Sequence, residues 1–293
     1  MVTCAPGALI AQEFRGVGTL GYGHSSVSNG GGDISSFTLD GAGSVNFDSG
    51  VHIGFDATIA KIDPDQAGGD VDANEFGLTL NYQFTNGTVL GGYIDHASID
   101  TNPLGSGDFT SYGLSGGYVN NEFGVELFFG ETETSPSLPA GVDWVDYGIN
   151  VRYAATDQFR FGGHYIVSEL SGGGSVDLSS WGIGGTYSFA NGWSGFAGVS
   201  QFDIETVNAD ATTFGFGAGY NLQQVVKTPA LLSLELARTD LSVGGASADV
   251  DTIRLGITFA LGDSNGEQPL NSVARSVMSP RHNSVSTAIN TAF

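Results

Sequence analysis

The sequence is built from short runs in which apolar and polar residues alternate, and these runs recur from residue 13 to residue 262. In one run, Phe76, Leu78, Leu80, Tyr82 and Phe84 alternate with Glu75, Gly77, Thr79, Asn81 and Gln83. Successive side chains of a strand point to opposite faces, so each run predicts a strand with one apolar and one polar face. No window approaches the roughly 18 consecutive apolar residues that a membrane-spanning helix needs.

The runs pair into hairpins. Candidate tight turns lie at 48–50, 85–87, 120–122, 155–157, 190–192 and 221–223, and several contain Asn-Gly or Ser-Gly, which favour tight hairpin turns. The opposite ends lie at 28–33, 63–70, 101–108, 131–141, 171–175, 206–211 and 242–249, and are richer in Gly, Asp, Ser and Pro. Short turns at one rim and longer loops at the other are typical of outer-membrane barrels.

A soluble β-sandwich also alternates, but three features favour a transmembrane antiparallel up-and-down β-barrel. The runs match the roughly 9–11 residues of a tilted crossing. Charged residues are only 14% of the chain, and Gly, Ser, Thr and Ala dominate the polar face. Aromatic residues flank the tight turns, as in an interfacial girdle: Phe47, Tyr82, Phe84, Tyr118, Phe123, Tyr153, Phe159, Tyr187, Phe189, Trp193 and Tyr220. Counting gives about 14 strands, with 12 or 16 as alternatives.

The net charge of −22 argues against two classes of partner. Nucleic acids and anionic membrane surfaces are bound by clustered cations, and the nine Lys and Arg are scattered singly. An acidic loop rim would favour cations at a pore mouth, although a soluble acidic protein would carry the same charge.

The two ends of the chain break the hairpin pattern. Residues 1–12 resemble the remnant of an export signal or a disordered N-terminus, and contain Cys4, the only cysteine. Residues 263–293 form a tail in which Leu270, Val273, Ala274, Val277 and Met278 have helical spacing. We expect this tail to be a flexible periplasmic extension, with a short helix at the rim or inside the barrel as the alternative.

Alternation also assigns charged residues to the lumen wall: Asp40, Asp56, Glu75, Glu126, Asp146, Arg152, Arg160, Glu235 and Arg254. Acidic and basic groups on separate stretches of wall predict a transverse field and a mild preference for cations. The alternative is that these groups only pair and hydrate the wall. Gly182, Gly184, Gly215, Gly217 and Gly219 fall on the same inner face, where small residues leave room for water.

With its hairpins, its turn asymmetry and its closing strand VDTIRLGITFALG, the segment Glu13–Gly262 resembles Gram-negative outer-membrane porins. The resemblance implies a location in the outer membrane, contact with lipid and lipopolysaccharide, and passive passage of small hydrophilic solutes or ions, often by a homotrimer. General porins have more strands and a long constriction loop. Here the longest candidate loop, Glu131–Val142, is modest, which weakens the case for a trimer and for that kind of constriction.

Other functions are weaker hypotheses. A surface adhesin or a structural barrel would use the same fold without conducting. A barrel enzyme would need a positioned base, but His164 and Ser168 lie roughly 13 Å apart along one strand. The sequence therefore predicts no catalytic residues and no cofactor. Asp63, Asp65, Asp70 and Asp72 offer oxygen ligands for a loop Ca²⁺, but their spacing departs from a known calcium loop.

Overall fold

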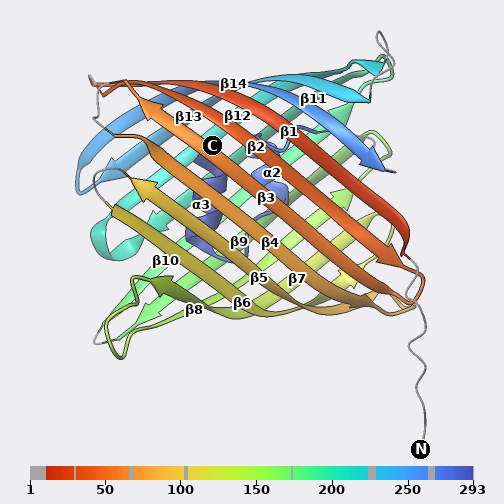
Figure 1. Cartoon of the computed structure of the whole chain (residues 1–293), viewed down its shortest axis with the longest axis horizontal. Helices are drawn as coiled ribbons and strands as arrows, with labels where there is room; N and C mark the ends of the chain where they lie inside the picture. The colour runs from red at the N-terminus through yellow and green to blue at the C-terminus, as the bar shows by residue number, and fades with distance from the viewer. Residues whose placement is uncertain are drawn as a thin grey trace, which may run out of the picture.

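The computed structural model describes residues 11–29, 31–65, 69–101, 105–172, 174–223, 229–262 and 268–292. Fourteen strands form one closed antiparallel barrel in which each strand pairs with its neighbours in sequence and β1 pairs with β14 (Figure 1). The predicted fold and the predicted strand number are both confirmed. The strands are β1 (Ala11–Val27), β2 (Gly32–Phe47), β3 (Val51–Pro64), β4 (Val71–Gln83), β5 (Thr88–Thr101), β6 (Gly105–Val119), β7 (Phe123–Ser135), β8 (Asp143–Ala154), β9 (Phe159–Ser171), β10 (Ser175–Ser188), β11 (Trp193–Ile204), β12 (Ala209–Asn221), β13 (Ala230–Val243) and β14 (Ala246–Gly262).

The alternation in sequence becomes an outer apolar face and an inner face of different composition. On β4, Phe76 and Leu80 are exposed on the outside, while Glu75 points inward and is buried in the lumen. The same alternation holds on β14, where Leu255 and Ile257 are exposed and Arg254 is buried. The outer face therefore presents the continuous apolar band that a lipid environment requires.

Aromatic side chains group on the outer surface beside the tight turns, as predicted. Tyr82 and Phe84 meet edge to face with their ring centroids 4.8 Å apart. Trp193 and Tyr220 pack at 5.0 Å, and Tyr187 packs at 4.7 Å against Phe189. Because aromatic rings favour the membrane–water boundary, these contacts place the turn rim near one interface.

The predicted tight turns lie where the strands end, and glycine is required in several of them. Gly50 and Gly87 have φ values of +85° and +88°, which favour glycine, and each donates its amide to a carbonyl three residues back. The opposite rim differs from the prediction, because the strands continue into most of the expected loops. β13 and β14 are joined by only Gly244 and Gly245, and the longest described connection at that rim is 136–142. We call these the turn rim and the loop rim.

The C-terminal tail lies inside the barrel, and the favoured expectation of a flexible periplasmic extension is wrong. Helices α2 (Val273–Met278) and α3 (Ser284–Ala292) lie within the strands in Figure 1 and contact β9, β10 and β11 from inside. Ser272 caps α2 by accepting the amide of Arg275, and the Asn283 side chain accepts the amides of Val285 and Ser286 at the start of α3. None of the helices in the described residues is long and apolar enough to cross a membrane.

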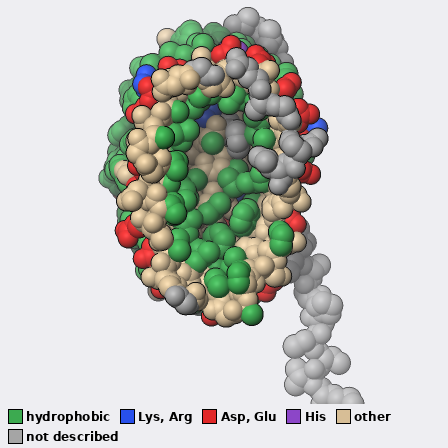
Figure 2. Space-filling view, turned by 90° about the vertical axis from the view of Figure 1, so that its left-hand side faces the viewer, with side chains coloured by type: hydrophobic (Ala, Val, Ile, Leu, Met, Phe, Trp, Pro, Cys, Tyr) green, Lys and Arg blue, Asp and Glu red, His purple; other side chains and the backbone are tan. Residues whose placement is uncertain are grey.

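The loop-side half of the lumen has apolar walls, which the sequence analysis did not expect. Inward-facing Ile62, Ala97, Trp144 and Leu178 are buried there. Figure 2 looks into the loop-rim mouth and shows acidic side chains around the rim and hydrophobic side chains within the hollow. The charged part of the lumen therefore lies deeper, around the tail and toward the turn rim.

The outer apolar band gives a first prediction. Leu114 is 74% exposed on β6 between outward-facing Tyr112 and Tyr118, and we place it near the middle of the bilayer. Replacing Leu114 by Arg should destabilise the folded barrel by about 2–4 kcal/mol, because a cation then faces hydrocarbon. Leu261→Arg is the matched control, since Leu261 is also outward-facing and exposed but lies next to the end of β14 at the turn rim, where the expected cost is about 0–1 kcal/mol. Reversible unfolding in lipid vesicles measures both, and equal costs would contradict the assigned depth.

Candidate functional site

Three of the five predicted inner-wall glycines, Gly182, Gly184 and Gly215, accommodate the tail rather than water, whereas Gly217 and Gly219 face the wall side chains of Phe196, Ser194 and Leu231. A Cβ added at Gly182 would lie 2.8 Å from a methyl group of Val277, and one at Gly215 would lie 2.7 Å from a methyl group of Val273. At Gly184 the added atom would meet the backbone of Ala274 at 3.1 Å. Any larger side chain at these positions would overlap α2, since packed interiors tolerate little added volume. These three glycines therefore let α2 lie directly on β10–β12.

Two predicted wall residues, Glu235 and Arg254, hold the ends of the tail helices. Glu235 accepts the amide of Val273 at 3.0 Å and a hydrogen bond from Arg254 at 3.0 Å. Arg254 also donates to the carbonyl oxygens of Thr291 and Ala292 at 3.0 and 2.9 Å. A cation at the C-terminal end of a helix satisfies carbonyls that lack partners within the helix. Both residues thus stabilise the tail inside the lumen.

The segment between the helices carries the strongest electrostatic contacts. Arg281 forms ion pairs with Asp56 and with Glu75, the latter at 3.1 Å, and lies 3.9 Å from Asp95. These acids come from the adjacent strands β3, β4 and β5, so one guanidinium offsets charge on three neighbouring strands. A cation this deeply buried must be paired to be stable, which makes Arg281 a principal anchor of the tail.

His282 is the second anchor and is held by both charge and ring contacts. Its Nδ1 lies 2.7 Å from Asp95, and its Nε2 lies 3.8 Å from Glu126. The imidazole stacks on Tyr93 with centroids 3.8 Å apart and meets Phe128 edge to face at 4.9 Å. Burial lowers the pKa of His282, but the charge of Asp95 and the hydrogen bonds to Asp95 and Glu126 outweigh it and raise the pKa to about 9. His282 is therefore protonated at neutral pH.

A network of small polar groups surrounds Asp146 on β8, next to the start of α3. Asp146 accepts from Ser168 and Thr132 at 2.5 Å and from the Trp144 indole at 3.0 Å. Asn283 donates to Thr132, and the amide of Ser284 donates to Ser168 at 3.1 Å. The beginning of α3 is thereby joined to the wall of β6–β9.

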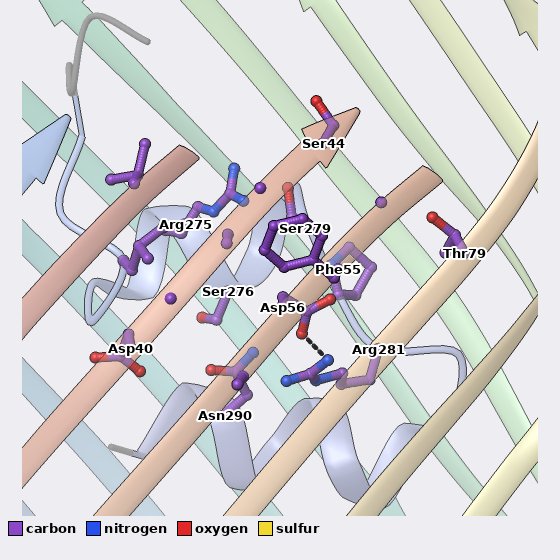
Figure 3. A pocket seen from close by; sticks show the side chains of 18 of the residues that line it. Asp40, Ser44, Phe55, Asp56, Thr79, Arg275, Ser276, Ser279, Arg281 and Asn290 are labelled. Carbon is purple, nitrogen blue, oxygen red and sulfur yellow. Dashed lines mark ion pairs between the residues drawn. The ribbon is translucent and has the colours of Figure 1, made fainter. Parts of the chain in front are cut away.

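A cavity of about 600 Å³ remains between the tail and the turn rim. Asp40 and Asp56 line it from β2 and β3, Arg152 and Arg160 line it from β8 and β9, and Arg275 enters it from α2. Figure 3 shows Asp40, Asp56, Arg275 and Arg281 around this space, with the ion pair between Asp56 and Arg281 marked. Acidic groups from β2, β3, β5 and β7 and basic groups from β1, β8, β9 and the tail thus line one polar cavity, and the two signs are only partly segregated.

The predicted wall residues therefore separate into two groups. Asp40, Asp56, Glu126, Arg152 and Arg160 line the cavity, whereas Glu75, Asp146, Glu235 and Arg254 are buried at the tail contacts. Sequence reasoning missed Asp95, Arg275, Arg281 and His282. Asp95 is recoverable from the alternation of β5, where Tyr93 and Ala97 share its face. Arg275 and Arg281 could have been found from one signal in the sequence. The chain has only nine Lys and Arg, so cations in the tail are expected to pair with the acidic inner wall.

The weaker candidates have structural contacts. His164 hydrogen-bonds the Val277 carbonyl at 2.9 Å and Ser180 at 3.2 Å, so its ring holds α2, and Ser168 binds Asp146 instead. Within the described residues no group of three or more His, Cys, Asp or Glu could hold a metal ion, and Asp72 pairs with Lys61 at 3.4 Å. The proposed signal remnant, with Cys4, lies almost entirely outside the described residues.

Comparison with known proteins agrees with this architecture. A family model described as Gram-negative porin matches residues 96–242, which is half of the chain. The chain belongs to the Gram-negative porins. The porin therefore lies in the outer membrane, as the resemblance implied.

Solved structures show the same fold at low identity. An anion-selective porin from Comamonas acidovorans is 11% identical with a TM-score of 0.52, over 85% of this chain and 99% of that chain. A FadL homologue from Pseudomonas aeruginosa is 12% identical with a TM-score of 0.50, over 85% of this chain and 90% of that chain. A sequence search among curated proteins finds no match.

The protonated anchor gives a prediction about pH. Because the pKa of His282 is raised from 6.5 to about 9, its contribution to docking is complete below about pH 6.5 and is lost as the pH rises through 9. The facing groups are Asp95, Glu126 and Asp146. Loss of a charged hydrogen bond of about 1.5–3 kcal/mol should weaken docking about tenfold or more.

A nitroxide on residue 289, in a Cys4→Ser background, measures this change by electron paramagnetic resonance. Its mobility should rise between pH 7 and pH 10 in the otherwise native porin. His282→Gln is the control and should show a loosened tail with little further pH dependence. The same pH-dependent increase in both proteins would show that another group is responsible.

Proposed function

We propose that this porin is a diffusion channel for small hydrophilic solutes or ions whose lumen is restricted by its own C-terminal segment. The cavity of about 600 Å³, lined by charged and amide side chains, carries the proposal, because a hydrated polar space inside a membrane barrel suits polar solutes. The connection 136–142 is largely exposed at the loop rim, so the tail occupies the place of a constriction loop.

The preference for cations is proposed for the lumen wall itself. Among the described residues, its inward-facing acids outnumber its arginines: Asp40, Asp56, Glu75, Asp95, Glu126, Asp146 and Glu235 face Arg15, Arg152, Arg160 and Arg254. The docked tail adds Arg275, Arg281 and His282 and offsets much of this excess. We therefore expect the tail to set both the width and the charge selectivity of the channel.

A non-channel barrel, acting as an adhesin or a structural protein, is the second candidate because the tail occupies the lumen. Well-anchored helices would suit a barrel that never opens. The family match favours the channel, and the remaining cavity gives solutes a polar environment next to the tail. Contacts with lipid and lipopolysaccharide, the homotrimeric state and the absence of enzymatic activity stay predictions.

Deleting residues 263–293 tests the channel directly. In planar bilayers, the truncated barrel should conduct several-fold more than the full chain, and its reversal potential in a salt gradient should shift toward cation selectivity. The double variant Arg281→Ala/His282→Ala is the matched control, since it keeps the tail but removes its anchors, and it should show frequent transitions to the larger conductance.

The outcome separates the two candidates. A truncated barrel that is folded by heat-modifiability and circular dichroism, yet silent in the bilayer, would contradict the channel and support the non-channel role. An unchanged reversal potential with increased conductance would contradict the assignment of selectivity alone.

A further inference from the structure

The alternation of apolar and polar residues is inverted at the loop ends of the strands. On β13, Asp240 is exposed on the outer face, whereas Leu241 and Val243 share the inner face with Glu235 and are still 36% and 61% exposed. Other strands carry apolar residues on the inner face near their loop ends: Ile99, Phe109, Val176, Phe202 and Val250. The loop ends are therefore polar toward the outside and apolar toward the lumen.

This apolar lining carries no charge above the level of the tail. Among the described residues, the inward-facing charges nearest the loop rim are those that hold the tail. Glu75 and Asp95 contact Arg281, and Glu235 and Arg254 hold the ends of the tail helices. Between this level and the loop rim, the inward positions of the described strands hold only Gly, Ala, Ser, Thr, Pro and larger apolar side chains.

Helix α3 closes this part of the lumen with an apolar face. Asn290 points into the polar turn-side cavity (Figure 3). The opposite face of the helix is apolar and at least partly exposed, but does not line that cavity: Val285, Ala288, Ile289 and Ala292. Its exposed surface therefore belongs to the loop-side half of the lumen. We call the space between this face and the loop rim the loop-side chamber, and Figure 2 shows hydrophobic side chains within it.

The chamber has the chemistry of a site for an uncharged apolar solute. A large exposed apolar surface is unusual unless it binds a partner, and small-molecule sites are lined mainly by apolar and aromatic groups. Phe109 and Trp144 meet there edge to face with their ring centroids 5.7 Å apart. A charged solute would find no compensating charge in this lining, and the acidic side chains around the mouth in Figure 2 disfavour anions further.

We propose that the loop-side chamber binds an uncharged apolar small molecule, of the kind represented by a substituted benzene. The strands surround the chamber and the tail forms its floor, so a solute enters through the mouth at the loop rim. This inference goes beyond the diffusion channel, because binding requires no passage past the tail. The chamber and the polar cavity lie on opposite sides of the tail, which gives one barrel two spaces of different chemistry.

Trp144 reports the occupancy of the chamber. It is the tryptophan that faces the lumen, since Trp181 hydrogen-bonds Gln201 on the outer face and Trp193 is exposed at the turn rim. In a Trp181→Phe/Trp193→Phe background in lipid vesicles, bromobenzene should quench the fluorescence of Trp144 with a saturable dependence on concentration. Because their charge would be unpaired, 4-bromobenzoate and 4-bromobenzylammonium should need about tenfold higher concentrations for half-quenching.

A second single-tryptophan protein controls for bromobenzene dissolved in the lipid. In a Trp144→Phe/Trp193→Phe background, the remaining Trp181 lies on the outer face. Its quenching should rise without saturation as the lipid takes up more bromobenzene. Saturation with the same midpoint for Trp144 and Trp181 would assign the effect to the lipid phase and overturn the proposal.

Two pairs of variants locate the site. Ile289→Asp places a carboxylate on the chamber floor and should raise the half-quenching concentration of bromobenzene about tenfold, whereas Asn290→Asp adds the same charge on the polar side of α3 and should leave it unchanged. Leu241→Asp and Ser242→Asp form the same comparison on the wall, since these neighbours on β13 point inward and outward. This pair leaves the tail intact, so it decides the result if Ile289→Asp displaces the helix.

Each result decides the proposal. Equal quenching by all three probes would overturn it, and tighter binding of the ammonium probe would overturn it in favour of a cation site at the acidic mouth. Absence of saturable quenching in a folded barrel would overturn it outright. Bilayer conductance of the same preparation separates these failures from failure of the channel. A conducting porin without the apolar site keeps the proposed function, whereas a silent porin that binds bromobenzene keeps the site and loses the channel.

Discussion

Backbone hydrogen bonding in a medium without water is the constraint on which the whole molecule depends. Every strand must donate to and accept from two neighbours, and the register of β1 against β14 from Arg15–Gly262 to Val27–Val250 closes the last edge. Closure by 14 strands encloses a lumen wider than the wall side chains can fill. The tail occupies part of this space. Closure of the barrel therefore both permits it to span a membrane and creates the interior space in which the tail lies.

The wall and the tail are complementary in both shape and charge. Glycines on β10–β12 give α2 a close-packed surface, while acids on β3, β4 and β5 surround Arg281 and His282. Removing one partner from such buried pairs typically costs about 3–5 kcal/mol, because the other charge stays buried. The same pairing uses most of the acidic wall, so the docked tail and the free lumen differ in charge. One segment thus controls how much space and which charges a solute meets.

The barrel was predictable because its determinants are local. Alternation, Asn-Gly turns and flanking aromatics act within single hairpins, and they gave the fold, the strand number and the inward positions of residues such as Glu75 and Arg254. The place of the tail was not predictable from the same pattern. Docking depends on Arg281 meeting Glu75 and Asp95, which are about 200 residues earlier in the chain. The sequence also does not distinguish an inward glycine that faces water from one that faces a helix, so the inner-wall glycines did not reveal the tail.

The central claim is that the C-terminal segment lies inside the lumen, and an engineered disulfide tests it most directly. In a Cys4→Ser background, cysteines at positions 182 and 277 should cross-link under mild oxidation, because a Cβ at Gly182 would touch the Val277 side chain. Cysteines at 183 and 277 should stay reduced, since Ile183 points outward and is 59% exposed. Efficient 182–277 cross-linking in the membrane-embedded porin, without 183–277 cross-linking, is the predicted result. Failure of the 182–277 pair in a folded barrel would place the tail outside the lumen and contradict the account.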